Sequence, residues 1–278
     1  MSHKAAVIEG SEIRVLQSEL TSKDYLISVS LPYGYHDDIE KNWPVVYHID
    51  GNTYYGMITD IVRSMAWCGP TSDAIVVAIG YASETQLKEA WDERIDLRYH
   101  DLTPVQDDMQ DKERKERNGR EVKSGGGENF LEFINSDIIP FVESNYRVDE
   151  NKRTLAGHSL GGLFTLYAMF QNPGQFENFV ACSPSIYWKG QVMLEIEKDF
   201  ARERSALPLK LFLSMGELEK LEDDGDGSFY GMQRLIEQIE SRQYEQLKMA
   251  IRIFEDEDHC TVIAPSFAAG LKFALRDD

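Results

Sequence analysis

Gly157-His158-Ser159-Leu160-Gly161 has the pattern G-x-S-x-G, with a serine held between glycines. The segment before it, 152–156, is predicted to be a strand, and the apolar segment after it, 163–170, is long enough for a buried helix. Strand, sharp turn and helix are the setting of a nucleophile elbow, a strained turn that favours small neighbours. We therefore predict that Ser159 is a nucleophile. The N-terminus of the helix should then point backbone N–H groups at an oxyanion formed there.

The composition narrows the class of protein. Residues 1–278 are expected to form one domain, since this length suits a single α/β domain. The 29 basic and 48 acidic residues give a net charge of −19, which argues against nucleic acid as a partner. No apolar run approaches the roughly 20 residues of a membrane span, and the start shows no signal peptide. Three cysteines without C-x-x-C spacing suggest reduced thiols, so we expect a cytoplasmic protein.

Strands and helices alternate along the chain. This order predicts an α/β fold with a mostly parallel central sheet and helices on both faces. Apolar or alternating runs predict strands at 25–31, 43–49, 73–80, 152–156, 179–183, 209–215 and 248–254. Helical spacing of apolar residues predicts helices at 57–65, 130–145, 163–170, 189–203, 229–242 and 260–275.

A charged insertion at about 105–127 interrupts this alternation. Residues 106–117 are almost wholly charged, and Ser124-Gly125-Gly126-Gly127 is not expected to hold regular structure. The segment could be a short solvated helix or a disordered insertion. Its place before the elbow also suits a mobile flap beside an active site, with an inert loop as the alternative.

A serine hydroxyl becomes a good nucleophile only when a base removes its proton, so a histidine is required. The chain has six: His3, His36, His48, His100, His158 and His259. We expect His158, the variable residue of the elbow, to point away from the working face of the nucleophile. His259 follows the last predicted strand, and folds with this elbow have the order serine, acid, histidine. We therefore predict that His259 is the base.

The acid should follow the strand before that histidine. Glu217 and Glu219 come directly after the strand at 209–215, and either could orient the imidazole. Glu219 is favoured, because it lies three positions past the turn glycine Gly216. The weaker candidates are Asp223, Asp224, Asp256 and Asp258. The acidic stretch 223–227 lacks the spaced ligands of a calcium loop, so we predict no metal site.

The oxyanion needs two backbone N–H donors. Leu160, directly after the nucleophile, supplies the first. The turn Asp50-Gly51-Asn52 follows an early inner strand, where the second donor belongs, and we predict the N–H of Asn52. Gly51 would permit the close approach of the backbone.

Five segments occur in a telling order. They are His48-Ile49-Asp50-Gly51-Asn52, Phe141-Val142-Glu143-Ser144-Asn145-Tyr146-Arg147-Val148-Asp149, Ala156-Gly157-His158-Ser159-Leu160-Gly161-Gly162, Cys182-Ser183-Pro184-Ser185-Ile186-Tyr187-Trp188 and Asp258-His259. Together they resemble the esterase D-like branch of the α/β-hydrolases, and within it the enterobactin-type siderophore esterases. The resemblance runs from about residue 24 to the C-terminus.

This resemblance implies an α/β-hydrolase fold and a serine esterase that works through an acyl-enzyme on a small-molecule ester, without metal or organic cofactor. The same branch includes feruloyl and acetyl esterases of plant polysaccharides and mycolyltransferases. Carbohydrate-ester hydrolysis and acyl transfer are therefore alternatives. A binding protein without chemistry is the least favoured class, because Ser159, His259 and an acid candidate are all present.

The charge departs from what an anionic siderophore would favour. The candidate pocket residues are mostly aromatic: Tyr54, Tyr55, Trp67, Tyr187 and Trp188, with Arg98 as the basic candidate. We single out Trp188, Arg98 and Tyr55 as substrate-binding residues, and ordinary core packing is the alternative for the aromatic ones. With a net charge of −19, the expected substrate is a largely uncharged or weakly charged ester with an apolar or aromatic part.

Overall fold

A computed structural model of the chain describes residues 7–83, 87–222, 225 and 227–276. Its centre is an eight-stranded sheet in the order β1-β2-β4-β3-β5-β6-β7-β8. The strands are β1 (Ser11–Ser18), β2 (Lys23–Ser30), β3 (Trp43–Ile49), β4 (Ile75–Tyr81), β5 (Val148–His158), β6 (Asn178–Cys182), β7 (Lys210–Gly216) and β8 (Lys248–Phe254).

The direction of the strands places several loops at one edge of the sheet. β2 runs antiparallel to β1 and to β4, and all neighbouring pairs from β4 to β8 are parallel. The carboxyl ends of β3, β5, β6, β7 and β8 therefore lie together, which is where open α/β sheets place their sites. The predicted α/β fold is confirmed, although β1 was not predicted and β5 begins earlier than expected.

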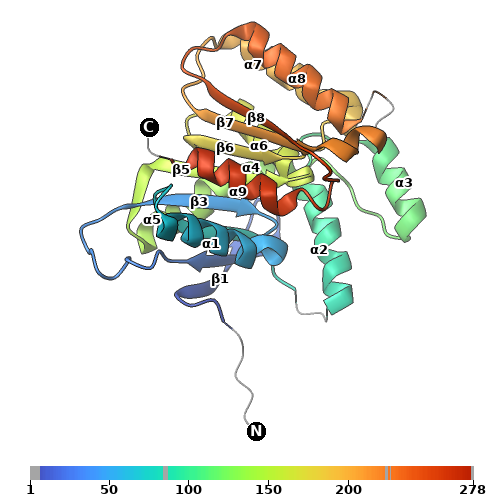
Figure 1. Ribbon diagram of the computed structural model, residues 1–278. Coiled ribbons are helices and arrows are strands. Elements are labelled where there is room, and N and C mark those ends of the chain that lie inside the picture. Colours follow the sequence, from blue (N-terminus) through green and yellow to red (C-terminus); the bar gives the residue numbers. More distant parts are fainter. Residues whose placement is uncertain (1–6, 84–86, 223–224, 226, 277–278) are drawn as a thin grey trace.

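Helices cover both faces of the sheet (Figure 1). Helices α1 and α9 pack on one face, α6 and the helical segment from α4 to α5 cover the other, and α7 and α8 extend this second layer. The bounds are α1 (Gly51–Cys68), α2 (Leu87–Asp101), α3 (Asp108–Asn118), α4 (Gly127–Phe133), η1 (Ile134–Ile138), α5 (Ile139–Asn145), α6 (Leu160–Gln171), α7 (Trp188–Glu203), η2 (Glu217–Glu222), α8 (Ser228–Arg242) and α9 (Ile263–Ala274).

The core has two halves, one on each face of the sheet. In β3, Val45 and Tyr47 contribute to the larger half, and Val46 between them contributes to the half beneath α1 and α9. This is the period of two that a strand imposes on its side chains. A near-continuous apolar run such as 43–49 is therefore explained by burial on both faces.

The charged insertion is ordered and attached to the rest of the protein. Helix α3 begins after Asp107, whose side chain accepts hydrogen bonds from the N–H groups of Met109 and Gln110. Arg114 of α3 pairs with Asp96 of α2 at 2.7 Å. Of the two alternatives, the helix is the one that the structure shows. Residues 124–126 have no regular structure, as expected, but Gly127 begins α4.

Two glycines of the elbow are required by close contacts. A Cβ atom on Gly157 would lie 2.3 Å from the carbonyl oxygen of Gly161, and one on Gly162 would lie 2.8 Å from the carbonyl oxygen of Cys182. Both contacts involve backbone, which has little room to move. Helix α6 can therefore begin directly against the ends of β5 and β6.

Candidate active site

Ser159 lies between β5 and α6 in a strained conformation. Its φ and ψ angles are 61° and −120°, in a region that residues with a side chain rarely adopt. Its N–H donates to the carbonyl oxygen of Cys182 at 3.0 Å, so the end of β6 holds the turn. The strand, turn and helix that the sequence predicts around Ser159 are thus present.

His259 reaches Ser159 from the loop after β8. The distance from its Nε2 to Ser159 Oγ is 3.0 Å, and that from its Nδ1 to Glu219 Oε2 is 2.8 Å. With Nδ1–H donating to the carboxylate, Nε2 is left to accept the proton of the serine hydroxyl. The structure therefore brings together the three side chains that the sequence singled out from different segments.

Glu219 lies in η2, directly after β7, and its carboxylate is held on both oxygens. Oε1 accepts a hydrogen bond from the N–H of Gly216 and another from Ser183 Oγ, each at 2.8 Å. Oε2 is then left facing His259. Ser183 was not predicted to take part. The signal available was its place directly after β6, at the edge that carries the elbow.

Glu217 and Asp258, two of the other acid candidates, have partners of their own. Glu217 forms an exposed ion pair with Lys220 at 2.7 Å, and the hydrogen bond from this lysine lowers the pKa of Glu217. Asp258 accepts hydrogen bonds from the N–H groups of Cys260 and Thr261, which lower its pKa and shape the loop that carries His259. Asp223 and Asp224 lie outside the described residues.

His158, which was expected to point away from the working face of Ser159, packs against His259. Its ring lies 4.6 Å from the ring of His259, and its Nε2–H donates to the backbone oxygen of His259 at 3.0 Å. Burial, together with the nearby charges of His259 and Arg98, lowers the pKa of His158 to about 3. The neutral imidazole therefore serves as a fixed hydrogen-bond donor beneath the His259 loop.

Arg98 is engaged within the protein. Its Nε donates to Asp50 Oδ1 at 2.6 Å, and its Nη2 donates to the backbone oxygen of His158 at 3.1 Å. The guanidinium thus joins the turn after β3 to the elbow. Arg98, the basic pocket candidate of the sequence, has its charge compensated by the carboxylate of Asp50.

The two candidate oxyanion donors lie at adjoining strand ends. Leu160 and Asn52 are the first and second residues of their helices, and N–H groups in the first turn have no acceptor within the helix. The side chain of Asn52 exchanges two hydrogen bonds with the backbone of Tyr81, at 2.7 and 3.0 Å. These bonds fix the turn after β3, and β3 lies beside β5 in the sheet.

A cleft of about 290 Å³ opens at Ser159. Ser185 was not predicted, yet its Oγ lies 3.3 Å from Ser159 Oγ. Tyr187 is 40% exposed and forms part of the wall, as does Phe229 at the start of α8. The lining consists of Ser159, Ser185, Tyr187, Glu219, Gly227, Ser228, Phe229 and His259.

Two predicted aromatic contacts lie away from this cleft. Trp188 is 1% exposed, its ring packs on Tyr99, and its indole N–H donates to the carbonyl oxygen of Val105 at 2.9 Å. Trp188 is therefore a core residue that joins α7 to the charged insertion. Tyr55 lies on α1 with its hydroxyl beside Ser11 and Ser30, at the β1–β2 side of the sheet. Core packing, the alternative for these aromatic residues, explains Trp188.

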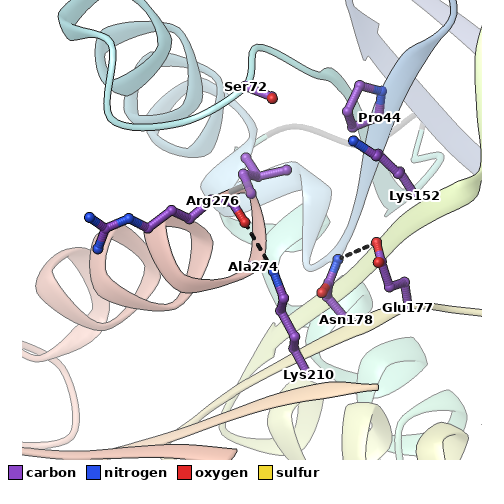
Figure 2. A pocket seen from close by; sticks show the side chains of 9 residues that line it. Pro44, Ser72, Lys152, Glu177, Asn178, Lys210, Ala274 and Arg276 are labelled. Carbon is purple, nitrogen blue, oxygen red and sulfur yellow. Dashed lines mark hydrogen bonds between the residues drawn. The ribbon is translucent and has the colours of Figure 1, made fainter. Parts of the chain in front are cut away.

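A second hollow, of about 210 Å³, lies at the opposite edge of the sheet. Figure 2 shows Lys152, Asn178 and Lys210 around it, at or near the amino ends of β5, β6 and β7. Lys210 donates to the backbone oxygen of Arg276 at 3.0 Å, next to the end of α9. The sheet separates this hollow from Ser159.

Two other findings concern the described residues alone. Among them, no group of three or more His, Cys, Asp or Glu side chains could hold a metal ion. None of their helices is both long enough and apolar enough to cross a membrane.

Comparison with known proteins identifies the family of the chain. A model of the family described as "Putative esterase" matches residues 18–260. The chain is 29% identical to the ferri-bacillibactin esterase BesA of Bacillus subtilis over 280 residues, which cover 99% of the chain and 92% of the relative. It is 32% identical to the siderophore enterobactin esterase of Emericella nidulans over 275 residues, which cover 90% and 88%.

A solved structure shares the whole fold. The siderophore hydrolase EstB from Aspergillus nidulans superposes with a TM-score of 0.82 at 27% identity, covering 99% of this chain and 98% of that one. The family match spans most of the chain, and the sheet and its elbow are those of an α/β-hydrolase. The chain therefore belongs to the family described as "Putative esterase" and is a carboxylic ester hydrolase.

Proposed function

We propose that the chain is a serine esterase in which Ser159 is the nucleophile, His259 the general base and Glu219 the acid that orients it. One observation carries the proposal, the continuous chain of contacts from Ser159 Oγ to His259 Nε2 and from His259 Nδ1 to Glu219 Oε2, at 3.0 and 2.8 Å. Nucleophile, base and orienting group within hydrogen-bond reach form the arrangement that serine catalysis needs.

Acylation begins when Ser159 Oγ attacks the ester carbonyl carbon and its proton passes to His259 Nε2. The carbonyl oxygen becomes an oxyanion, and we assign its stabilisation to the N–H groups of Leu160 and Asn52. Collapse of this intermediate breaks the bond to the alcohol oxygen. That oxygen takes the proton from His259, so an alcohol leaves and the acyl group stays on Ser159.

Deacylation repeats these steps with water. His259 Nε2 takes a proton from the water as its oxygen attacks the acyl carbon. The second oxyanion collapses with the bond to Ser159 Oγ as the one that breaks, and His259 returns the proton to that oxygen. Glu219 keeps Nδ1–H donating throughout, and its two hydrogen bonds to Gly216 and Ser183 hold it in place. The products are a carboxylic acid and the free enzyme.

For the substrate we infer a siderophore ester, and a cyclic trilactone is the first candidate. Two observations support this choice. Relatives of the chain are named as esterases of ferri-bacillibactin and of enterobactin, and Tyr187 and Phe229 form part of the walls of the cleft. Aromatic walls suit flat apolar groups, and the hydroxyls of Ser185 and Ser228 can bond the polar groups between them.

We also place the enzyme in a reducing compartment, the cytoplasm. Cys68, Cys182 and Cys260 are unpaired, and Cys260 is exposed directly beside His259. An exposed thiol next to the catalytic base would be a liability where disulfides form readily.

Covalent labelling tests the nucleophile. A fluorophosphonate should label the protein once, with the adduct on the peptide that contains Ser159, and Ser159→Ala should abolish labelling. An adduct on Ser185, 3.3 Å from Ser159, would transfer the role to that residue. A panel of aryl esters of graded chain length and a catechol trilactone then tests the substrate, with Ser159→Ala as the blank. Added alcohols would reveal acyl transfer as new esters in place of acids.

A further inference from the structure

A narrow crevice lies beside the turn that carries the proposed oxyanion donor. Asn52 and Thr53 line one side of it, and α2 lines the other through Trp91, Arg94 and Arg98. The α2 residues are three, four and seven positions apart, which puts them on one face of the helix. Arg98 in turn donates to the backbone oxygen of His158, the residue before Ser159. The crevice is thus a near neighbour of the reacting centre.

Arg94 and Arg98 differ in how their charges are compensated. Arg98 pairs with Asp50 at 2.6 Å. Arg94 has no ion pair with any residue in the described part of the chain, and its Nε is buried without a hydrogen-bond partner. The negative charge of Asp50 cancels the positive charge of Arg98, so the positive charge of Arg94 remains in the crevice. A buried donor without a partner costs free energy, which an anionic acceptor on a ligand would recover.

Trp91 adds a flat surface next to this charge. Trp91 is 51% exposed, so part of its ring faces solvent beside the crevice. The crevice itself measures about 20 Å³, which is room for an oxygen atom but not for a ring. A planar group would therefore lie outside, against Trp91, with only its acidic oxygen entering toward Arg94.

We propose that Trp91 and Arg94 form a specificity subsite for a planar acyl group that carries an anionic oxygen, such as a carboxylate or a phenolate. The proposal rests on the function proposed above, since it places the acyl group beside the oxyanion donor Asn52. It also explains how so acidic a chain can take a negatively charged ester, because one uncompensated guanidinium acts locally where the net charge of −19 is screened beyond about 8–10 Å.

Two esters that differ in one charge test the subsite. The 4-nitrophenyl esters of benzoic acid and of 3-carboxybenzoic acid release the same alcohol. For Arg94→Met we expect kcat/KM on the carboxylated ester to fall about tenfold, mostly through KM, as loss of one charge-assisted hydrogen bond predicts. The neutral ester should change by about twofold or less. Arg94→Lys should recover part of the loss, and Trp91→Leu should lower kcat/KM on both esters.

Lys112→Met is the matched control. This lysine is 77% exposed on α3, so the variant makes the same change in net charge away from the crevice. Lys112→Met should leave kcat/KM unchanged on both esters. Equal losses on the two esters in Arg94→Met, or none on the carboxylated one, would overturn the subsite. If the wild-type protein hydrolysed neither ester and Ser159 resisted fluorophosphonate, the proposed function itself would fail, and these two failures are distinguished by the labelling.

Discussion

His158 and His259 lie ring against ring, 4.6 Å apart, and His158 Nε2–H donates to the backbone oxygen of His259 at 3.0 Å. The residue before Ser159 thus supports the loop that carries His259. Arg98 extends the connection, since it bonds both the backbone oxygen of His158 and the carboxylate of Asp50. Elbow, base loop and oxyanion turn are joined by these contacts and cannot shift independently.

Replacing His158 should therefore impair catalysis without touching the reacting atoms. We expect His158→Leu to lower kcat about tenfold with KM nearly unchanged, because a lost buried hydrogen bond of about 1–2 kcal/mol lets His259 drift. His158→Gln, which keeps a donor, should retain more activity at similar thermal stability. The pH–rate profile of the leucine variant should also shift. Equal losses in both variants, with an unchanged profile, would reduce His158 to a packing residue.

Ser159 and His259 should behave as one unit. Ser159→Ala and His259→Ala should each lower kcat by about 10⁴-fold or more, and the double variant should be little worse than either. Once the nucleophile is gone, the base has no proton to accept. Steady-state kinetics on an aryl ester checks this, with circular dichroism as evidence of folding. Losses that multiply in the double variant would mean that the two side chains act separately.

Glu219 and Glu217 are two residues apart, so the same substitution at each position compares their roles. Glu219→Gln should lower kcat by roughly 10²- to 10⁴-fold, since an amide at Oε2 no longer stabilises the imidazolium. Glu217→Gln breaks only an exposed ion pair with Lys220, so activity should change about twofold or less. KM should stay nearly constant in both. The reverse ranking would assign the orienting role to Glu217, and no loss in either would leave a serine–histidine dyad.

Two buried histidines should make stability depend on pH. Burial lowers the pKa of His48 to about 4 and that of His158 to about 3, against about 6.5 in an unfolded chain. Below pH 6.5 the unfolded state binds more protons than the folded state, so the free energy of unfolding falls as the pH falls toward 4. Above pH 6.5 the two neutral histidines make their full contribution to stability. Each histidine should contribute about 2 kcal/mol to the loss between pH 7.5 and pH 5.

Urea unfolding at the two pH values measures this effect. His48→Asn supplies the comparison, because it removes one titrating group while leaving a side-chain donor for the carbonyl of Ile49, which His48 contacts at 3.1 Å. The variant should be less stable at neutral pH but lose less of its stability on acidification. A pH dependence as steep as that of the wild-type protein would show that His48 does not set it.

The sequence predicts the buried strands well because burial on both faces leaves a continuous apolar run. It misses β1, an edge strand in which Ile13 and Val15 remain 57% and 55% exposed. It also misses α2, whose attachment depends on the tertiary ion pairs Arg98–Asp50 and Arg114–Asp96. Partners so distant in the chain leave no periodic signal.

The sequence likewise predicts some residues of the candidate site and not others. Ser159, His259 and Glu219 follow from motif, chain order and strand ends. The direction of a side chain does not. The sequence therefore predicts a pocket role for Trp188 and Tyr55, whereas Trp188 lies in the core and Tyr55 lies at the β1–β2 side of the sheet. Ser183 and Ser185 were overlooked, because a serine in a turn is ordinary until its neighbours in space are known.

The contacts of Gly157 and Gly162 bear on how this enzyme can change over generations. A larger residue at Gly157 would press on the backbone of Gly161, and one at Gly162 would press on the backbone of Cys182 at the end of β6. These two positions should therefore tolerate substitution as poorly as Ser159 and His259 do. The cleft wall at Tyr187 and the exposed Trp91 carry no such constraint. Substitutions at the cleft wall and at Trp91 can therefore change which ester the protein accepts, while the sequence of the elbow around Ser159 stays the same.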